Sequence, residues 1–75
     1  MIQNDNSIRL LDVVALTDDL TDQGLLRGQV GTVVDVLAPS VFEVEFSDDD
    51  GRAYALTTLR ASQLLVLHYE PRRAA

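Results

Sequence analysis

The chain has 75 residues, of which 47% are hydrophobic, so it has room for one ordinary globular domain with a single core. It carries 12 acidic and 6 basic side chains, which gives a formal charge of -6, and every basic residue is an arginine. This balance argues against a basic, phosphate-binding surface, so we expect no nucleic-acid partner and a preference for basic proteins.

The chain has no cysteine and a single histidine, so neither disulfides nor a structural metal is expected to hold the fold together. Domains of this length are marginally stable, and association with a second copy often stabilises them. A homodimer is therefore an alternative that the sequence leaves open. No apolar run exceeds the length of residues 64–67, far below the roughly 20 residues that span a bilayer, and no secretory signal is visible. We expect no membrane partner and a cytoplasmic location.

The first predicted elements are a polar segment, a strand and a long loop. Residues 1–7 are polar and aperiodic, and we expect them to be flexible. Residues 12–17 are rich in β-branched side chains, which favours a strand. Residues 18–28 contain acids, threonine and two glycines without a regular period, which indicates an irregular loop. We expect the leucines of this loop to pack onto the core. These leucines are Leu20, Leu25 and Leu26.

Residues 29–37 predict the longest strand of the domain. Alternate positions along it place four side chains on one face: Val30, Thr32, Val34 and Val36. Gly31, inside this strand, indicates a bend, a bulge or a close backbone approach. Residues 38–40 contain the proline and serine of a turn.

Residues 41–46 show the clearest alternation in the chain, with two phenylalanines and a valine on one side and Glu43 and Glu45 on the other. This pattern predicts a strand with one buried face and one wet, acidic face. Residues 47–51 end in the Asp-Gly pair that favours a tight hairpin turn. Residues 52–59 then return as a fourth strand.

The last predicted elements are a 3₁₀ turn over residues 60–63 and a fifth strand over residues 64–68. A strand, a long loop, three strands with short connections, a 3₁₀ turn and a final strand is the layout of an SH3-like barrel. We therefore predict an all-β domain over residues 8–69, a small five-stranded SH3-like barrel with a long loop after its first strand. Residues 70–75 follow as a flexible tail.

Four short motifs carry a resemblance to a known family. They are Leu-Asp-Val-Val-Ala-Leu-Thr at 11–17, Gly-Leu at 24–25, Gly-x-x-Gly-Thr-Val-Val at 28–34 and Glu-Val-Glu-Phe at 43–46. In these motifs the chain resembles the DUF4926 family of small bacterial proteins of unknown function, over roughly residues 11–67. The resemblance implies a compact barrel. It also implies an immunity or antitoxin role, since family members are often encoded beside small proteins of which some are toxin-like.

Residues 28–36 also resemble the KOW motif of ribosomal and transcription proteins. That likeness concerns the structure of the segment. The basic residues that a KOW domain would use on RNA are missing from this acidic chain, so no RNA-binding function is inferred from it.

The sequence contains no recognisable catalytic, cofactor or metal motif. The consecutive acids Asp48, Asp49 and Asp50 lack the alternating spacing of a calcium loop, which favours a solvated hairpin tip. His68 has no nucleophile motif to activate. The glycines of residues 28–31 are too few for a phosphate-binding loop, and no helix follows them. We expect a protein that is not an enzyme and that has no cofactor.

One candidate partner-binding surface is acidic. Glu43 and Glu45 lie beside the hairpin acids of residues 48–50, with Asp35 on a neighbouring strand. These acids form a one-signed patch that fits a basic protein partner, and the alternative is that they only keep a small domain soluble.

A second candidate surface is apolar. Residues 64–67 are apolar at every position, so Leu65 or Leu67 stays outside a one-sided core unless the long loop or a second subunit covers it. Our leading interpretation is a non-enzymatic protein-binding module, immunity-like toward a basic partner. The alternative is a structural or assembly subunit that forms a homodimer through its last strand.

Overall fold

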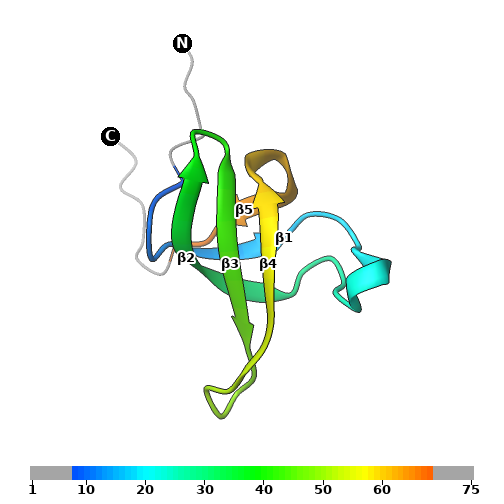
Figure 1. The fold of residues 1–75 in the computed structure, drawn as a ribbon. Coiled ribbons are helices and arrows are strands. Elements are labelled where there is room, and N and C mark those ends of the chain that lie inside the picture. Colours follow the sequence, from blue (N-terminus) through cyan, green and yellow to red (C-terminus); the bar gives the residue numbers. More distant parts are fainter. Residues whose placement is uncertain (1–7, 69–75) are drawn as a thin grey trace, which may run out of the picture.

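The computed structural model describes residues 8–68. The flexible ends predicted for residues 1–7 and 70–75, and Tyr69, lie outside the described residues. The described part is all-β, with five antiparallel strands in one sheet in the order β4-β3-β2-β1-β5 (Figure 1). This confirms the predicted fold class. Among residues 8–68, no helix is long and apolar enough to pass through a bilayer.

The strands lie close to the predicted ranges. They are β1 (Val13–Leu16), β2 (Val30–Ala38), β3 (Val41–Ser47), β4 (Ala53–Arg60) and β5 (Leu64–Val66). Two 3₁₀ turns accompany them, η1 (Thr21–Gln23) inside the long loop and η2 (Ala61–Gln63) before β5. The fifth strand is shorter than predicted, because only the Leu67 N–H continues the pairing, with the Val13 carbonyl at 2.9 Å.

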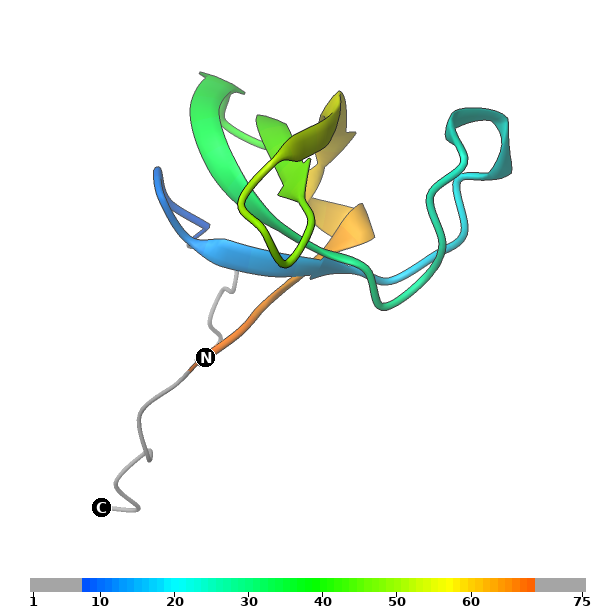
Figure 2. The same cartoon turned by 90° about the horizontal axis from the view of Figure 1, so that it is seen from below.

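The sheet is strongly curled, so that β1 and β5 lie on one side of the core and β3 and β4 on the other (Figure 2). β2 runs between the two sides, and its pairing with β3 is interrupted by register shifts at Val33/Asp35 and Val36/Ala38. Extra residues of this kind bend a strand and increase its twist. The hydrogen-bonded ladder ends at β4 and β5, so the described sheet is open at these two edges. This arrangement is consistent with the SH3-like layout expected from the sequence.

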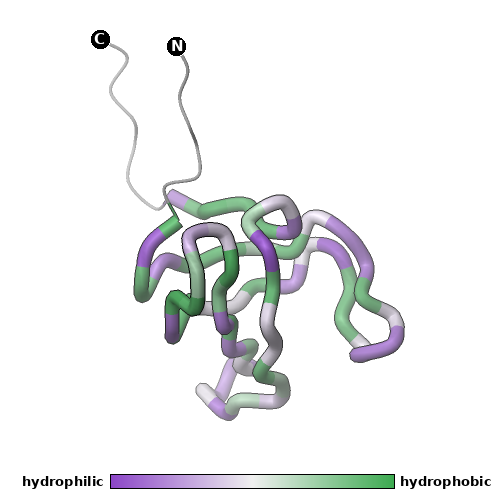
Figure 3. The backbone as a smooth tube through the Cα atoms, turned by 45° about the horizontal axis from the view of Figure 1, so that its top comes forward, coloured by the Kyte–Doolittle hydropathy of each residue, from purple (hydrophilic) through white to green (hydrophobic). Residues whose placement is uncertain are grey.

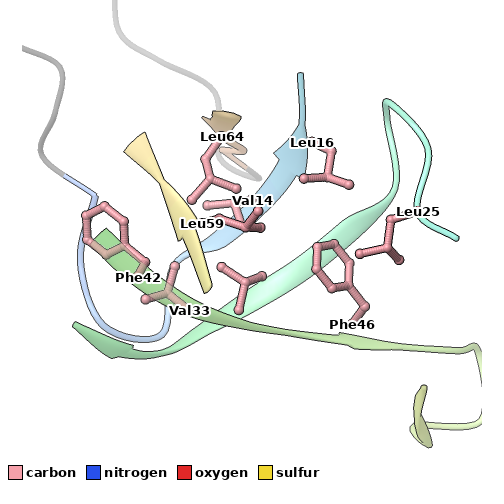
Figure 4. Close-up of a cluster of buried hydrophobic side chains, with 9 residues drawn as sticks. Val14, Leu16, Leu25, Val33, Phe42, Phe46, Leu59 and Leu64 are labelled. Atoms are coloured by element: carbon pink, nitrogen blue, oxygen red, sulfur yellow. The ribbon is translucent and has the colours of Figure 1, made fainter. Parts of the chain in front are cut away.

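The core lies inside the curl and is centred on β3. Phe42, Val44 and Phe46 are almost completely buried, as the alternation of this strand predicted. Figure 4 shows the buried side chains meeting from β1, β2, β3 and β4. The remaining members of the buried cluster are Val14, Leu16, Leu25, Val33, Leu59 and Leu64.

The alternation expected along β2 holds only for its first half. Gly31 and Val33 are the buried, inward positions, whereas Val30 and Val34 are exposed. Beyond the first register shift Val36 pairs with an inward residue of β3, so it does not share the face of Val30. The prediction of one continuous face was wrong here, because each extra residue moves the following side chains to the other face of the strand.

Gly31 is required by a close approach between neighbouring strands. A Cβ at this position would lie 2.8 Å from the carbonyl oxygen of Glu45, 2.8 Å from a methyl of Val44 and 3.0 Å from the ring of Phe46. Real Cβ atoms essentially never come within 3.0 Å of such neighbours. Of the three explanations that the sequence offered for this glycine, close backbone approach is therefore present.

The long loop between β1 and β2 contributes to the core. Leu25 is 1% exposed and belongs to the same buried cluster as Phe46. Leu20 and Leu25 form an isolated bridge, with reciprocal backbone hydrogen bonds of 2.7 and 3.1 Å, around a turn in which Gly24 has a φ of 71°. Leu26 was expected on the core as well, but it is exposed.

Two side-chain hydrogen bonds attach this loop to β4. The Thr57 hydroxyl donates to Gln23 Oε1 at 2.6 Å, and Gln29 Nε2 donates to the Tyr54 hydroxyl at 2.9 Å. The Tyr54 ring also lies beside Phe46, with 6.4 Å between the ring centroids. The loop therefore gives β4, an open edge of the described sheet, a second neighbour besides β3.

Candidate interaction surface

The chemistry of the outward side chains differs between the two sides of β2. The register places Thr32 of β2 between Val13 of β1 and Glu45 of β3. On the β1 side of this strand the outward side chains are apolar, and on the β3 side they include the acids Glu43 and Glu45. Because the sheet curls at β2, the outward faces of β1 and β3 point in different directions (Figure 2). The predicted site residues thus belong to two surfaces.

We define the acidic surface as Asp35, Glu43 and Glu45. Asp35 and Glu43 are direct cross-strand partners on β2 and β3. The Thr58 hydroxyl of β4 donates to Glu43 Oε1 at 2.7 Å, which orients that carboxylate. Asp35 Oδ1 accepts the N–H of Val36 at 2.9 Å. Like charges directly opposite each other destabilise a sheet, so this pair of acids does not serve the stability of the fold.

Two carboxylates elsewhere in the chain have a structural role. Asp12 and Asp19 each accept a backbone N–H in their own turn or loop, both at 2.8 Å. Glu43 and Glu45 differ, because β3 is paired with β2 on one side and β4 on the other, which uses its backbone groups in the ladder. The backbone therefore gives no reason for these two positions to be acidic.

The hairpin acids have unequal roles. Asp48 Oδ1 accepts the backbone N–H groups of Asp50 and Arg52, both at 2.9 Å, so this carboxylate holds the turn together. Gly51 has a φ of 83°, as a tight Asp-Gly turn requires. Asp49 and Asp50 are exposed and make the hairpin tip hydrophilic (Figure 3). Within residues 8–68 no three His, Cys, Asp or Glu side chains gather in a way that could hold a metal ion.

We define the apolar surface by the outward side chains of β1, β5 and the first half of β2, together with Leu11. Cross-strand pairing sets Leu65, Ala15 and Val30 in one row, and Leu67 and Val13 follow in the next. The whole surface consists of Val13, Ala15, Val30, Thr32 and Leu65, with Leu11 before β1 and Leu67 after β5.

The predicted apolar residues differ in exposure. Leu65 is 58% exposed, and Leu67 is half-buried. The long loop does not cover Leu65, since that side chain stays exposed, and the buried leucine of the loop, Leu25, points into the core. His68, which follows them, is exposed.

Sequence reasoning missed Leu11, Ala15 and Val30 as parts of a surface. The register between strands brings these residues together, and the period of a single strand does not show the register. The apolar pair Leu10 and Leu11, just before a predicted strand, was a signal for Leu11 in the sequence.

Comparison with protein families gives one match. The family model described as a domain of unknown function, DUF4926, matches residues 10–66. The chain belongs to the DUF4926 family. The matched range contains all five strands, so the acidic surface lies within the DUF4926 domain, as does the apolar surface apart from Leu67. No curated protein and no solved structure is significantly similar to the chain.

Proposed function

We propose that this DUF4926 protein is a non-enzymatic, cytoplasmic binding module of bacteria that holds a basic protein on its acidic surface. The observation that carries the proposal is the cross-strand pair Asp35 and Glu43. Two like charges face each other on paired strands, where they lower stability, and no backbone donor of β3 needs Glu43 or Glu45. Cationic side chains of a partner would relieve this repulsion.

The sheet makes the acidic surface suitable for binding. Glu43 and Glu45 lie on a strand that is paired on both sides, so the partner does not have to order them. The formal charge of -6 would attract a basic protein over a distance and speed the encounter. An exposed charge contact of this kind weakens as salt increases.

Within this class, an immunity role fits best. Resemblance to the family implies neighbouring toxin-like proteins, and a toxin with a basic surface would be complementary to Glu43, Glu45 and Asp35. Binding would neutralise such a toxin by covering its basic residues.

Capture from cell extract with immobilised protein tests the proposal through two charge-reversed variants. Glu43→Lys with Glu45→Lys alters the acidic surface, whereas Asp18→Lys with Asp22→Lys changes the net charge equally on the long loop, where both acids are exposed. We expect a basic protein to be retained by the wild type and the loop variant and lost by the surface variant. Equal capture by all three, or capture that salt does not weaken, would contradict the proposal.

The same two variants test the immunity role. The basic protein retained in the capture experiment is expressed in cells that also produce wild-type or variant chain, and growth is measured. We expect protection from the wild type and the loop variant and little from Glu43→Lys with Glu45→Lys. Unchanged protection by that surface variant would remove the acidic surface from the mechanism.

A further inference from the structure

The apolar surface carries no charge at its strand positions and is exposed at Leu65 and Val30. Within the described strands, the outward positions of β1, β5 and the first half of β2 hold Val13, Ala15, Leu65, Val30 and Thr32, none of which is charged. Leu65 is 58% and Val30 43% exposed, whereas Ala15 between them is 9% exposed. In a chain with a formal charge of -6, a neutral area of this kind lets two copies approach without bringing acids together.

Leu11 adds a separate observation at one corner of this surface. It has a φ of 73°, in the left-handed region that leucine rarely adopts, and its side chain is 69% exposed. Its N–H donates to the Val33 carbonyl at 2.7 Å, which holds the strained residue beside β2. Asparagine or glycine would adopt this backbone at lower cost and would expose less apolar area. The fold therefore displays a leucine where its own stability favours another residue.

We propose that a second copy of this chain packs face to face on the apolar surface. The small Ala15 lies at the centre of a row, with the larger Leu65 on one side and Val30 on the other. A two-fold axis running roughly along β1 places Leu65 of each copy over Val30 of its partner, with the two alanines between them. An isologous dimer requires a surface that is complementary to itself, as large side chains on both sides of a small one are here. Two sheets pack face to face in aligned β-sandwiches.

Charge favours a second copy over a basic protein at this surface. The acids that would attract a basic partner, Asp35, Glu43 and Glu45, belong to the β2–β3 side, which the curl of the sheet turns away from β1 and β5 (Figure 2). A dimer built on the apolar surface leaves both acidic surfaces on its outside. It could then bind a basic partner at two places.

The size of the surface predicts a weak dimer. Neighbouring strands lie about 4.8 Å apart, and successive outward residues of one strand lie about 6.8 Å apart. A surface of three strands and three rows therefore covers on the order of 300 Å². Stable interfaces bury about 800 Å² per partner. The dimer should therefore form only at high protein concentration.

Sedimentation equilibrium of the full chain, from about 10 µM to 1 mM, tests the proposal. We expect the average mass to rise from 8.3 kDa toward twice that value. Leu65→Thr, which keeps a good strand former, and Leu11→Asn should each weaken association by about tenfold or more. The matched control is Leu56→Thr, because Leu56 is 59% exposed but lies on the outward face of β4. This variant should associate like the wild type.

Thermal unfolding at low concentration separates binding from folding. Leu11→Asn should unfold at the same temperature as the wild type or a higher one, since asparagine relieves the left-handed strain. A monomer at about 1 mM would overturn the proposal, as would association that Leu65→Thr and Leu11→Asn leave unchanged or that Leu56→Thr weakens equally. Dissociation in high salt would also overturn it, because apolar contacts do not weaken with salt. These outcomes are independent of whether a basic protein binds the acidic surface.

Discussion

Asp35 is a single residue that lowers the stability of the sheet to which it belongs. Its carboxylate lies opposite Glu43 in the register of β2 and β3, and it also accepts the N–H of Val36 at 2.9 Å. An asparagine would keep an oxygen for that N–H and remove the charge. The acidic side chain therefore adds repulsion that the local backbone structure does not require.

We predict that Asp35→Asn raises the free energy of unfolding by about 0.2–1 kcal/mol, since like charges opposite each other destabilise paired strands. Urea unfolding at low salt measures the change, and the gain should shrink at high salt. Glu45→Gln is the control, because Glu45 lies opposite the uncharged Thr32 and Leu56. A loss of stability in Asp35→Asn, or an equal gain in Glu45→Gln, would contradict the repulsion.

At the scale of elements, the long loop and β4 depend on each other. The loop places Leu25 in the core, and Gln23 and Gln29 bind the side chains of Thr57 and Tyr54. β4 is an open edge of the described sheet, and these contacts give it a neighbour besides β3. The loop is therefore a part of the fold that holds the edge strand in place.

This role predicts that neighbouring leucines of the loop differ sharply. Leu25→Ala should lower the free energy of unfolding by about 2–5 kcal/mol, the range for buried leucines. Leu26→Ala should change it by less than about 0.5 kcal/mol, because Leu26 is exposed. Urea unfolding of both variants measures the difference. A loss for Leu25→Ala as small as that expected for Leu26→Ala would contradict the burial of Leu25.

At the scale of the whole molecule, the alternation of apolar and polar residues was enough to predict the strands and their order along the chain. β3 was predicted closely because it has one buried face and one wet face, and Phe42 and Glu43 mark these faces without ambiguity. The 3₁₀ turn before β5 was predicted as well. These features depend on local sequence, which a single chain contains in full.

The remaining features depend on contacts between distant segments. The faces of β2 changed at two register shifts, which no local pattern marks. The sequence predicted only that Asp35 and Glu43 lie on neighbouring strands, not that they are direct cross-strand partners. The row of Leu65, Ala15 and Val30 depends on the registers between three strands. The sequence therefore contained the residues of both surfaces but not their division along β2.

Taken as a whole, the molecule has two outward surfaces of different chemistry, and we propose that the acidic one binds basic protein. The chain has other exposed acids, such as Asp18 and Asp22 on the long loop. If the charges served only solubility, a basic ligand would bind all of them in proportion to their number. Selective binding of a ligand to Glu43 and Glu45 requires that these residues form a specific binding surface.

The most direct test is a heteronuclear NMR titration of the dilute, isotopically labelled chain with a lysine-rich peptide. We predict amide shifts concentrated at Glu43, Glu45 and Thr58, which disappear in the variant Glu43→Lys with Glu45→Lys. Amides of Asp18 and Asp22 should change little. Shifts spread evenly over the exposed acids, or a titration that the variant leaves unchanged, would contradict the claim that the acidic surface is a specific binding site.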